Sequence, residues 1–71
     1  SRAWYAMVWC AKEAMYKLYG RRGVDLLDEI RVVGYDATLG RIYGVVGDDS
    51  RVIVDISILD ESYVVAVATY E

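Results

Sequence analysis

The side chains that usually carry out catalysis are scarce in this chain. Histidine is absent and Cys10 is the one cysteine, which excludes a histidine general base and the Cys–His and Ser–His nucleophile pairs. Cys10 falls in the apolar part of a predicted helix, where we expect it to behave as a small buried hydrophobic residue. The sequence therefore predicts that the chain is not an enzyme and has no catalytic residue.

Two pairs of adjacent carboxylates are the residues best suited to hold a metal ion. Asp48-Asp49 and Asp60-Glu61 could ligate Mg²⁺ or Ca²⁺ through oxygen. Both pairs fall where the chain is expected to turn, however, and acidic turn residues are usually solvated. The glycines match neither a phosphate-binding loop nor a dinucleotide-binding fingerprint. We therefore expect no metal site and no cofactor.

Four basic residues gather toward the end of the same helix and just beyond it. They are candidate RNA contacts, since lysine and arginine side chains bind phosphate groups: Lys12, Lys17, Arg21 and Arg22. The alternative interpretation is that they complement the negative end of the helix dipole. The formal net charge of −3 favours this alternative, because an independent nucleic-acid-binding domain normally carries net positive charge.

The 71 residues suffice for a single domain, residues 1–71, and 56% of them are hydrophobic. A chain this short buries only about 60% of the surface that its unfolded form exposes. Small domains are therefore usually stabilised further by disulfides, metal ions or association. One cysteine and no histidine exclude an internal disulfide and an ordinary zinc site. Association remains, and we expect the partner to be another protein subunit or a second copy of the chain.

The composition also bears on the source and location of the protein. Phe, Pro, His, Asn and Gln are all absent, a bias typical of thermophile proteins; an engineered, reduced alphabet would look the same. The apolar run at 3–11 is far shorter than the ~20 residues of a membrane-spanning helix. We therefore expect a cytoplasmic protein with no membrane partner.

One helix and two strands are predicted over the first two thirds of the chain. Residues 3–19 are rich in helix formers and place apolar side chains on one stripe, and Gly20 is suited to end the helix. A connector or a short helical turn follows at 24–28. The alternating segments 29–35 and 41–47 are then predicted to be strands joined by a short loop, in which Asp36 caps the backbone and Gly40 adopts a positive φ.

The last third admits two interpretations at one point. Residues 51–59 alternate like a strand, yet Asp49 and Ser50 could cap a helix over the same residues; the sequence favours the strand. Residues 63–70 are apolar on both faces and are predicted to be a strand covered on both sides. The fold class is therefore α+β, with an N-terminal helix packed on one face of a small antiparallel sheet of three to four strands.

The second face of the strand at 63–70 needs a cover. If nothing in the chain covers it, a partner must, because a strand with two apolar faces is unfavourable in water. The side chains that we expect at this protein interface are Tyr63, Val65, Val67 and Tyr70.

About half of the chain resembles a known family. The helix end EAMYKLYG (13–20) and the hairpin GYDATLGRIYGVVG (34–47) resemble the archaeal and eukaryotic ribonuclease P protein subunit called Pop-five. The matching residues occur in the family's order: Leu18, Tyr19, Gly20, Tyr35, Asp36, Thr38 and Ile42. The sequence departs from the family in three ways: it lacks a strand before the helix unless residues 3–10 form it, it favours a strand at 51–59 where the family has a helix, and it is less basic.

The resemblance implies a non-catalytic role. Subunits of this family pair with a second protein subunit and help to fold the catalytic RNA, which cleaves the 5′ leader of precursor tRNA with Mg²⁺. The expected function is therefore a protein subunit of a ribonucleoprotein that assists tRNA processing. The alternative is a self-associating structural or regulatory α+β module with no RNA role, and a designed or simplified protein is the third hypothesis.

Overall fold

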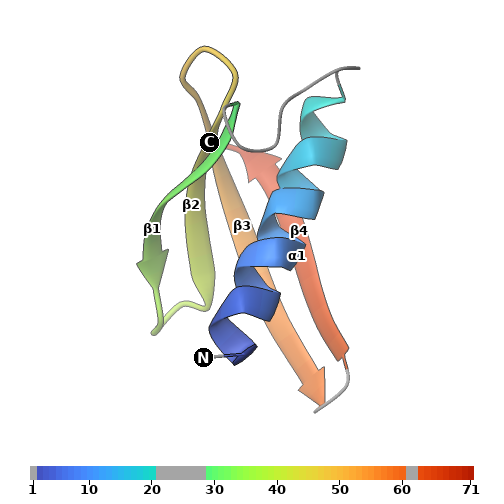
Figure 1. Cartoon of the computed structure of the whole chain (residues 1–71). Helices are drawn as coiled ribbons and strands as arrows, with labels where there is room; N and C mark the ends of the chain where they lie inside the picture. The colour runs from blue at the N-terminus through green and yellow to red at the C-terminus, as the bar shows by residue number, and fades with distance from the viewer. Residues whose placement is uncertain (1, 21–28, 61–62) are drawn as a thin grey trace.

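The structure, a computed structural model, describes residues 2–20, 29–60 and 63–71. These residues form α1 (Arg2–Tyr19), β1 (Ile30–Asp36), β2 (Arg41–Val46), β3 (Ser50–Asp60) and β4 (Tyr63–Tyr70). The helix lies across one face of the sheet (Figure 1). The predicted α+β architecture is thus confirmed, with four strands in the sheet. The predicted connector at 24–28 lies outside the described residues.

The helix ends where the sequence indicates. Gly20 has a φ of +67°, and its N–H donates a hydrogen bond to the Tyr16 carbonyl at 3.0 Å. Glycine adopts this left-handed conformation without the steric cost that a side chain adds, which makes it a common helix terminator. At its other end α1 begins at Arg2, so residues 3–10 are helical and do not supply the strand that precedes the helix in the Pop-five family.

The four strands form an antiparallel meander in which sequence neighbours pair. The order is β1-β2-β3-β4, so β1 and β4 are the two edges of the sheet. In the turn between β1 and β2, the Leu39 N–H donates to Asp36 Oδ1 at 3.0 Å and Gly40 has a φ of +63°. The expected roles of Asp36 and Gly40 in this loop are confirmed.

The ambiguous segment 51–59 is part of a strand, β3. Val52 and Val54 are buried, while Arg51 and Asp55 on the alternate side are exposed. A period of two therefore accounts for burial along this segment, as a strand requires. β3 pairs with β2 and β4 on its two sides, so the strand interpretation is confirmed and the helix that Asp49 and Ser50 could have capped does not form.

The core is a single layer between α1 and the sheet. Its fully buried side chains come from the helix and from three strands: Ala11, Met15, Ile30, Ile42, Val46, Val52 and Val54. Gly44 lies under Met15, and a Cβ at this position would clash with the Met15 Sδ. The missing side chain of Gly44 thus lets the helix approach the middle of the sheet closely.

Candidate protein interface

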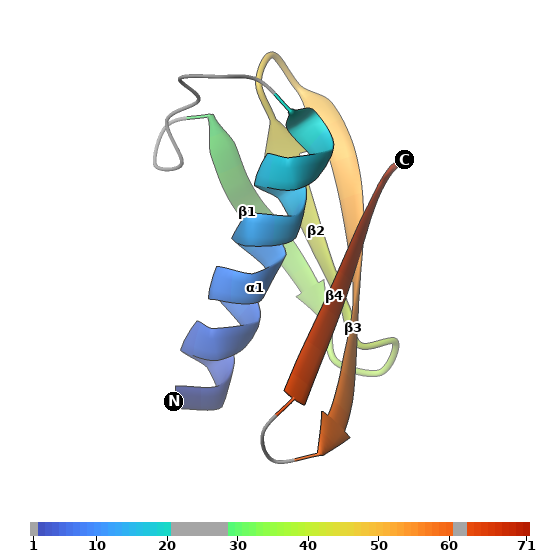
Figure 2. The same ribbon diagram turned by 90° about the vertical axis from the view of Figure 1, so that its right-hand side faces the viewer.

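Strand β4 is apolar on both sides, but α1 covers only one of them. Ala66 and Ala68 pack against the core under the helix, whereas Val65 and Val67 are 41% and 54% exposed on the other side. We call the sheet face opposite α1 the open face. Figure 2 shows the two layers, with the helix on one side of the sheet and no other described segment on the open face. The cover that the sequence predicts for the second side of β4 is therefore not supplied by the described residues.

The structure brings together three of the four predicted interface residues. Tyr63, Val65 and Val67 follow each other at every second position, so they share the open face. Tyr70 pairs with Val52, whose side chain is buried under the helix; Tyr70 therefore lies on the helix side. Tyr63, Val65 and Val67 occupy odd positions of the strand and Tyr70 an even one. Because alternate residues of a strand point to opposite faces, the sequence alone could have separated Tyr70 from the other three.

The end of β3 and the start of β4, which form one hairpin, carry further exposed apolar side chains. This hairpin extends beyond the first turn of α1 in both views (Figures 1 and 2). Ile58 lies on the helix side, two residues after Ile56, yet it is 65% exposed because the helix does not reach it. Leu59 and Tyr63 beside it are exposed to a similar extent. We call Ile58, Leu59 and Tyr63 the hairpin tip; the sequence pattern did not identify the first two as surface residues.

Charged side chains on the open face are paired with one another. Arg41 Nε donates a hydrogen bond to Asp55 Oδ1 at 2.9 Å, and this hydrogen bond and the Asp55 charge raise the pKa of Arg41. Asp55 in turn pairs in register with Val67. The Arg51–Glu71 and Arg31–Asp49 pairs are longer, at 3.8 and 3.9 Å. All of the arginines in the strands thus have a carboxylate within reach, which leaves little unpaired positive charge on this face for phosphate.

The predicted RNA contacts do not form one patch among the described residues. Lys12 and Lys17 are five positions apart, which turns them about 140° from each other around the helix. Lys12 accordingly lines a groove between α1 and β1, and Lys17 lines another between α1 and β4. Arg21 and Arg22 lie outside the described residues.

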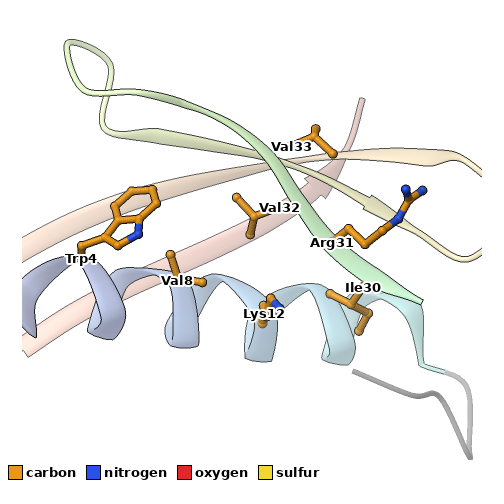
Figure 3. A pocket seen from close by; sticks show the side chains of 7 residues that line it. All are labelled: Trp4, Val8, Lys12, Ile30, Arg31, Val32 and Val33. Carbon is orange, nitrogen blue, oxygen red and sulfur yellow. The ribbon is translucent and has the colours of Figure 1, made fainter. Parts of the chain in front are cut away.

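The groove between α1 and β1 combines an aromatic ring with a cation. Figure 3 shows Trp4 on α1 reaching toward β1 and Lys12 two turns further along the helix, whereas Arg31 extends from the opposite side of the strand. The Trp4 ring is held edge-on against Tyr35, with 5.0 Å between the ring centroids. An aromatic ring and a lysine that line one groove are a combination that can contact a base and a phosphate.

The groove between α1 and β4 is mainly apolar. It is lined by Trp9, Cys10, Ala14 and Ala66, with Glu13 and Lys17 at its margin. Trp9 is 62% exposed, an unusual degree of exposure for the largest apolar side chain. The groove therefore adds apolar surface beside β4 on the helix side of the sheet.

The described residues contain neither a metal-binding cluster nor a membrane-spanning helix. Among residues 2–20, 29–60 and 63–71, no three His, Cys, Asp or Glu side chains gather closely enough to hold a metal ion. Within the same part of the chain, no helix combines the length and apolarity that crossing a bilayer needs.

The fold and this surface define a small α+β domain with an apolar edge strand that the described residues cover on one side only. Comparison with known protein families, with characterised proteins and with solved structures finds no significant match.

Proposed function

We propose that this chain is a non-catalytic association module that binds protein through β4, with a second copy of itself as the partner. The observation that carries the proposal is the difference between the two sides of this strand. Ala66 and Ala68 are covered by α1, whereas Val65 and Val67 are exposed although they are equally apolar. Apolar surface of this kind on a small domain is typical of an interface.

The exposed side chains supply part of the free energy that association needs. Tyr63, Val65 and Val67 are each about half exposed, so covering one of them contributes on the order of 1 kcal/mol. Six such side chains in a dimer contribute on the order of 6 kcal/mol, near the low end of the about 4–15 kcal/mol that association costs in lost freedom. A stable complex therefore needs further contacts, which Ile58 and Leu59 of the hairpin tip and the backbone of β4 can provide.

A role in a ribonucleoprotein is the second candidate function. It is the role that the resemblance to the Pop-five family implies, and the groove with Trp4 and Lys12 favours it. The pairing of the strand arginines with carboxylates and the separation of Lys12 from Lys17 weigh against it.

The mass of the purified chain distinguishes the two functions. We expect light scattering to show one defined oligomer at moderate salt, and the mass to stay the same when structured RNA is added. A monomer that shifts to an RNA complex at low salt, and returns to a monomer as salt rises, would instead indicate the ribonucleoprotein role, because phosphate contacts weaken steeply with salt.

Two lysine variants test the RNA role residue by residue. If the groove between α1 and β1 binds RNA, Lys12→Ala weakens binding. It also lowers the slope of log binding constant against log salt concentration by about one, because one phosphate contact is lost. Lys17→Ala is the matched control, since it removes the same charge on the other flank of α1. The association module predicts that neither variant changes any residual RNA binding by more than about twofold. Filter binding over a range of salt concentrations measures both effects.

A further inference from the structure

Strand β4 has a free edge without the features that normally prevent pairing with another strand. It is last in the strand order, and Figure 2 shows it at the front of the view with no other helix or strand of the described residues covering it. Residues 63–70 contain no charge and no proline. The opposite edge strand, β1, carries Arg31, Gly34 and Asp36 and has a register shift between Val32 and Gly34. Charges and bulges protect edge strands, so β1 is protected and β4 is not.

The hydrogen-bond pattern shows which backbone groups of β4 point away from the sheet. The Glu71 N–H donates to the Arg51 carbonyl at 3.0 Å, in register with the Ile53–Thr69 and Asp55–Val67 pairs. In an antiparallel ladder, residues that bond to the neighbouring strand alternate with residues that point outward. The N–H and C=O groups that point to the free edge therefore belong to Val64, Ala66, Ala68 and Tyr70.

This outward row is complementary to itself. Two antiparallel copies must pair residues that lie on the same face, which limits the registers that are allowed. One register uses all four outward residues: Val64 opposite Tyr70 of the second copy, and Ala66 opposite its Ala68. It also places Val67 opposite the second copy's Val67 at the twofold axis, in a non-hydrogen-bonded pair whose side chains lie close together. Because residues 63–70 carry no charge, no like charges oppose each other along the paired strands.

We propose that two copies of the chain pair through the free edges of β4 in this register, so that their two four-stranded sheets become one continuous sheet. This proposal rests on the proposed function, which gives a second copy as the partner, and it adds the edge and the register through which the two copies bind. On the open face each copy places its Val67 beside the other's Val67 and its Val65 beside the other's Thr69. On the helix side the pairing brings the two grooves that carry Trp9 toward each other, so apolar side chains on both sides of the sheet gain neighbours from the second copy.

Disulfide cross-linking tests the register with two matched variants. Both carry Cys10→Ala, which removes the native thiol. In Val67→Cys the two Cα atoms at the axis are about 4.5 Å apart, within the range of a disulfide. In Val65→Cys the corresponding atoms are four residues out of register, about 14 Å apart. Both valines are partly exposed, so neither change disturbs the core.

We expect mild oxidation to convert most of the Val67→Cys protein, and less than about a tenth of the Val65→Cys protein, to covalent dimer. Cross-linking of Val65→Cys at an equal or higher rate would overturn the register. A dimer by light scattering in which neither variant cross-links would overturn edge pairing and leave the association module standing. A monomer at all concentrations would overturn both the edge pairing and the self-association of the chain. The free edge of β4 would then be a site for a strand of a different protein.

Discussion

Replacement of Val67 by Lys or by Glu converts the protein to a monomer, and a mixture of the two variants restores the dimer. Residue 67 faces its own copy across the proposed twofold axis, so each single variant places two like charges opposite each other. Like charges at a cross-strand pair are unfavourable, and with the loss of the contact between the valines we expect Kd to rise about 10- to 100-fold. In the mixture a lysine meets a glutamate, and the pair becomes attractive.

Sedimentation at several concentrations measures the effect on each variant and on the equimolar mixture. Val33→Lys is the matched control, because Val33 is a valine of the other edge strand with a similar exposure, 60% against 54% for Val67. We expect this control to leave Kd unaltered. Circular dichroism should show that all variants keep the fold, because Val67 is not part of the core. Equal weakening by Val33→Lys and Val67→Lys would mean that net charge, and not the contact at residue 67, governs association.

The second large effect concerns the close contact between α1 and the sheet. Met15→Ala leaves a cavity above Gly44 and should lower the free energy of unfolding by about 2–5 kcal/mol. Gly44→Ala should lower it by about 1–3 kcal/mol, because the new methyl group would clash with the Met15 Sδ in a fully buried layer. In the Met15→Ala background the clash with the methionine is gone and the methyl group still meets the Arg31 carbonyl oxygen at 3.2 Å, so Gly44→Ala should then lower the free energy of unfolding much less.

Thermal or denaturant unfolding of the four proteins at one fixed concentration measures this double-mutant cycle, since the stability of a dimer depends on concentration. Gly34→Ala is the control for backbone effects. A Cβ at Gly34 would meet only the Tyr43 ring, at an ordinary contact distance of 3.5 Å, and we expect little or no loss of stability. An equal loss of stability for Gly44→Ala in both backgrounds would contradict the packing described here.

Local periodicity predicted most of the fold. The apolar stripe and Gly20 located the helix, and the alternation of Val52 and Val54 with charged residues predicted β3 as a strand. These features depend on neighbours in the sequence, because side-chain direction repeats every 3.6 residues in a helix and every second residue in a strand. The apolar character of 63–70 on both faces likewise predicted that β4 needs a cover outside the helix.

The position of the helix over the sheet could not be predicted in this way. Which flank of α1 meets β1 and which meets β4 depends on the packing of Met15 over Gly44, a contact between distant segments. For this reason the sequence grouped Lys12 with Lys17, whereas the structure places them in different grooves. The same limit applies to Ile58, whose exposure follows from how far the hairpin extends beyond the helix.

Amide hydrogen exchange on the unmodified chain tests the role of β4 most directly. The N–H groups of Val65 and Val67 bond to β3 and are protected whether or not the chain associates. Those of Ala66 and Ala68 point to the free edge and are protected only when another strand bonds to them. We predict that Ala66 and Ala68 exchange as slowly as Val65 and Val67 at high concentration and faster on dilution. Fast exchange at Ala66 and Ala68 at every concentration, beside slow exchange at Val65 and Val67, would contradict pairing through this edge.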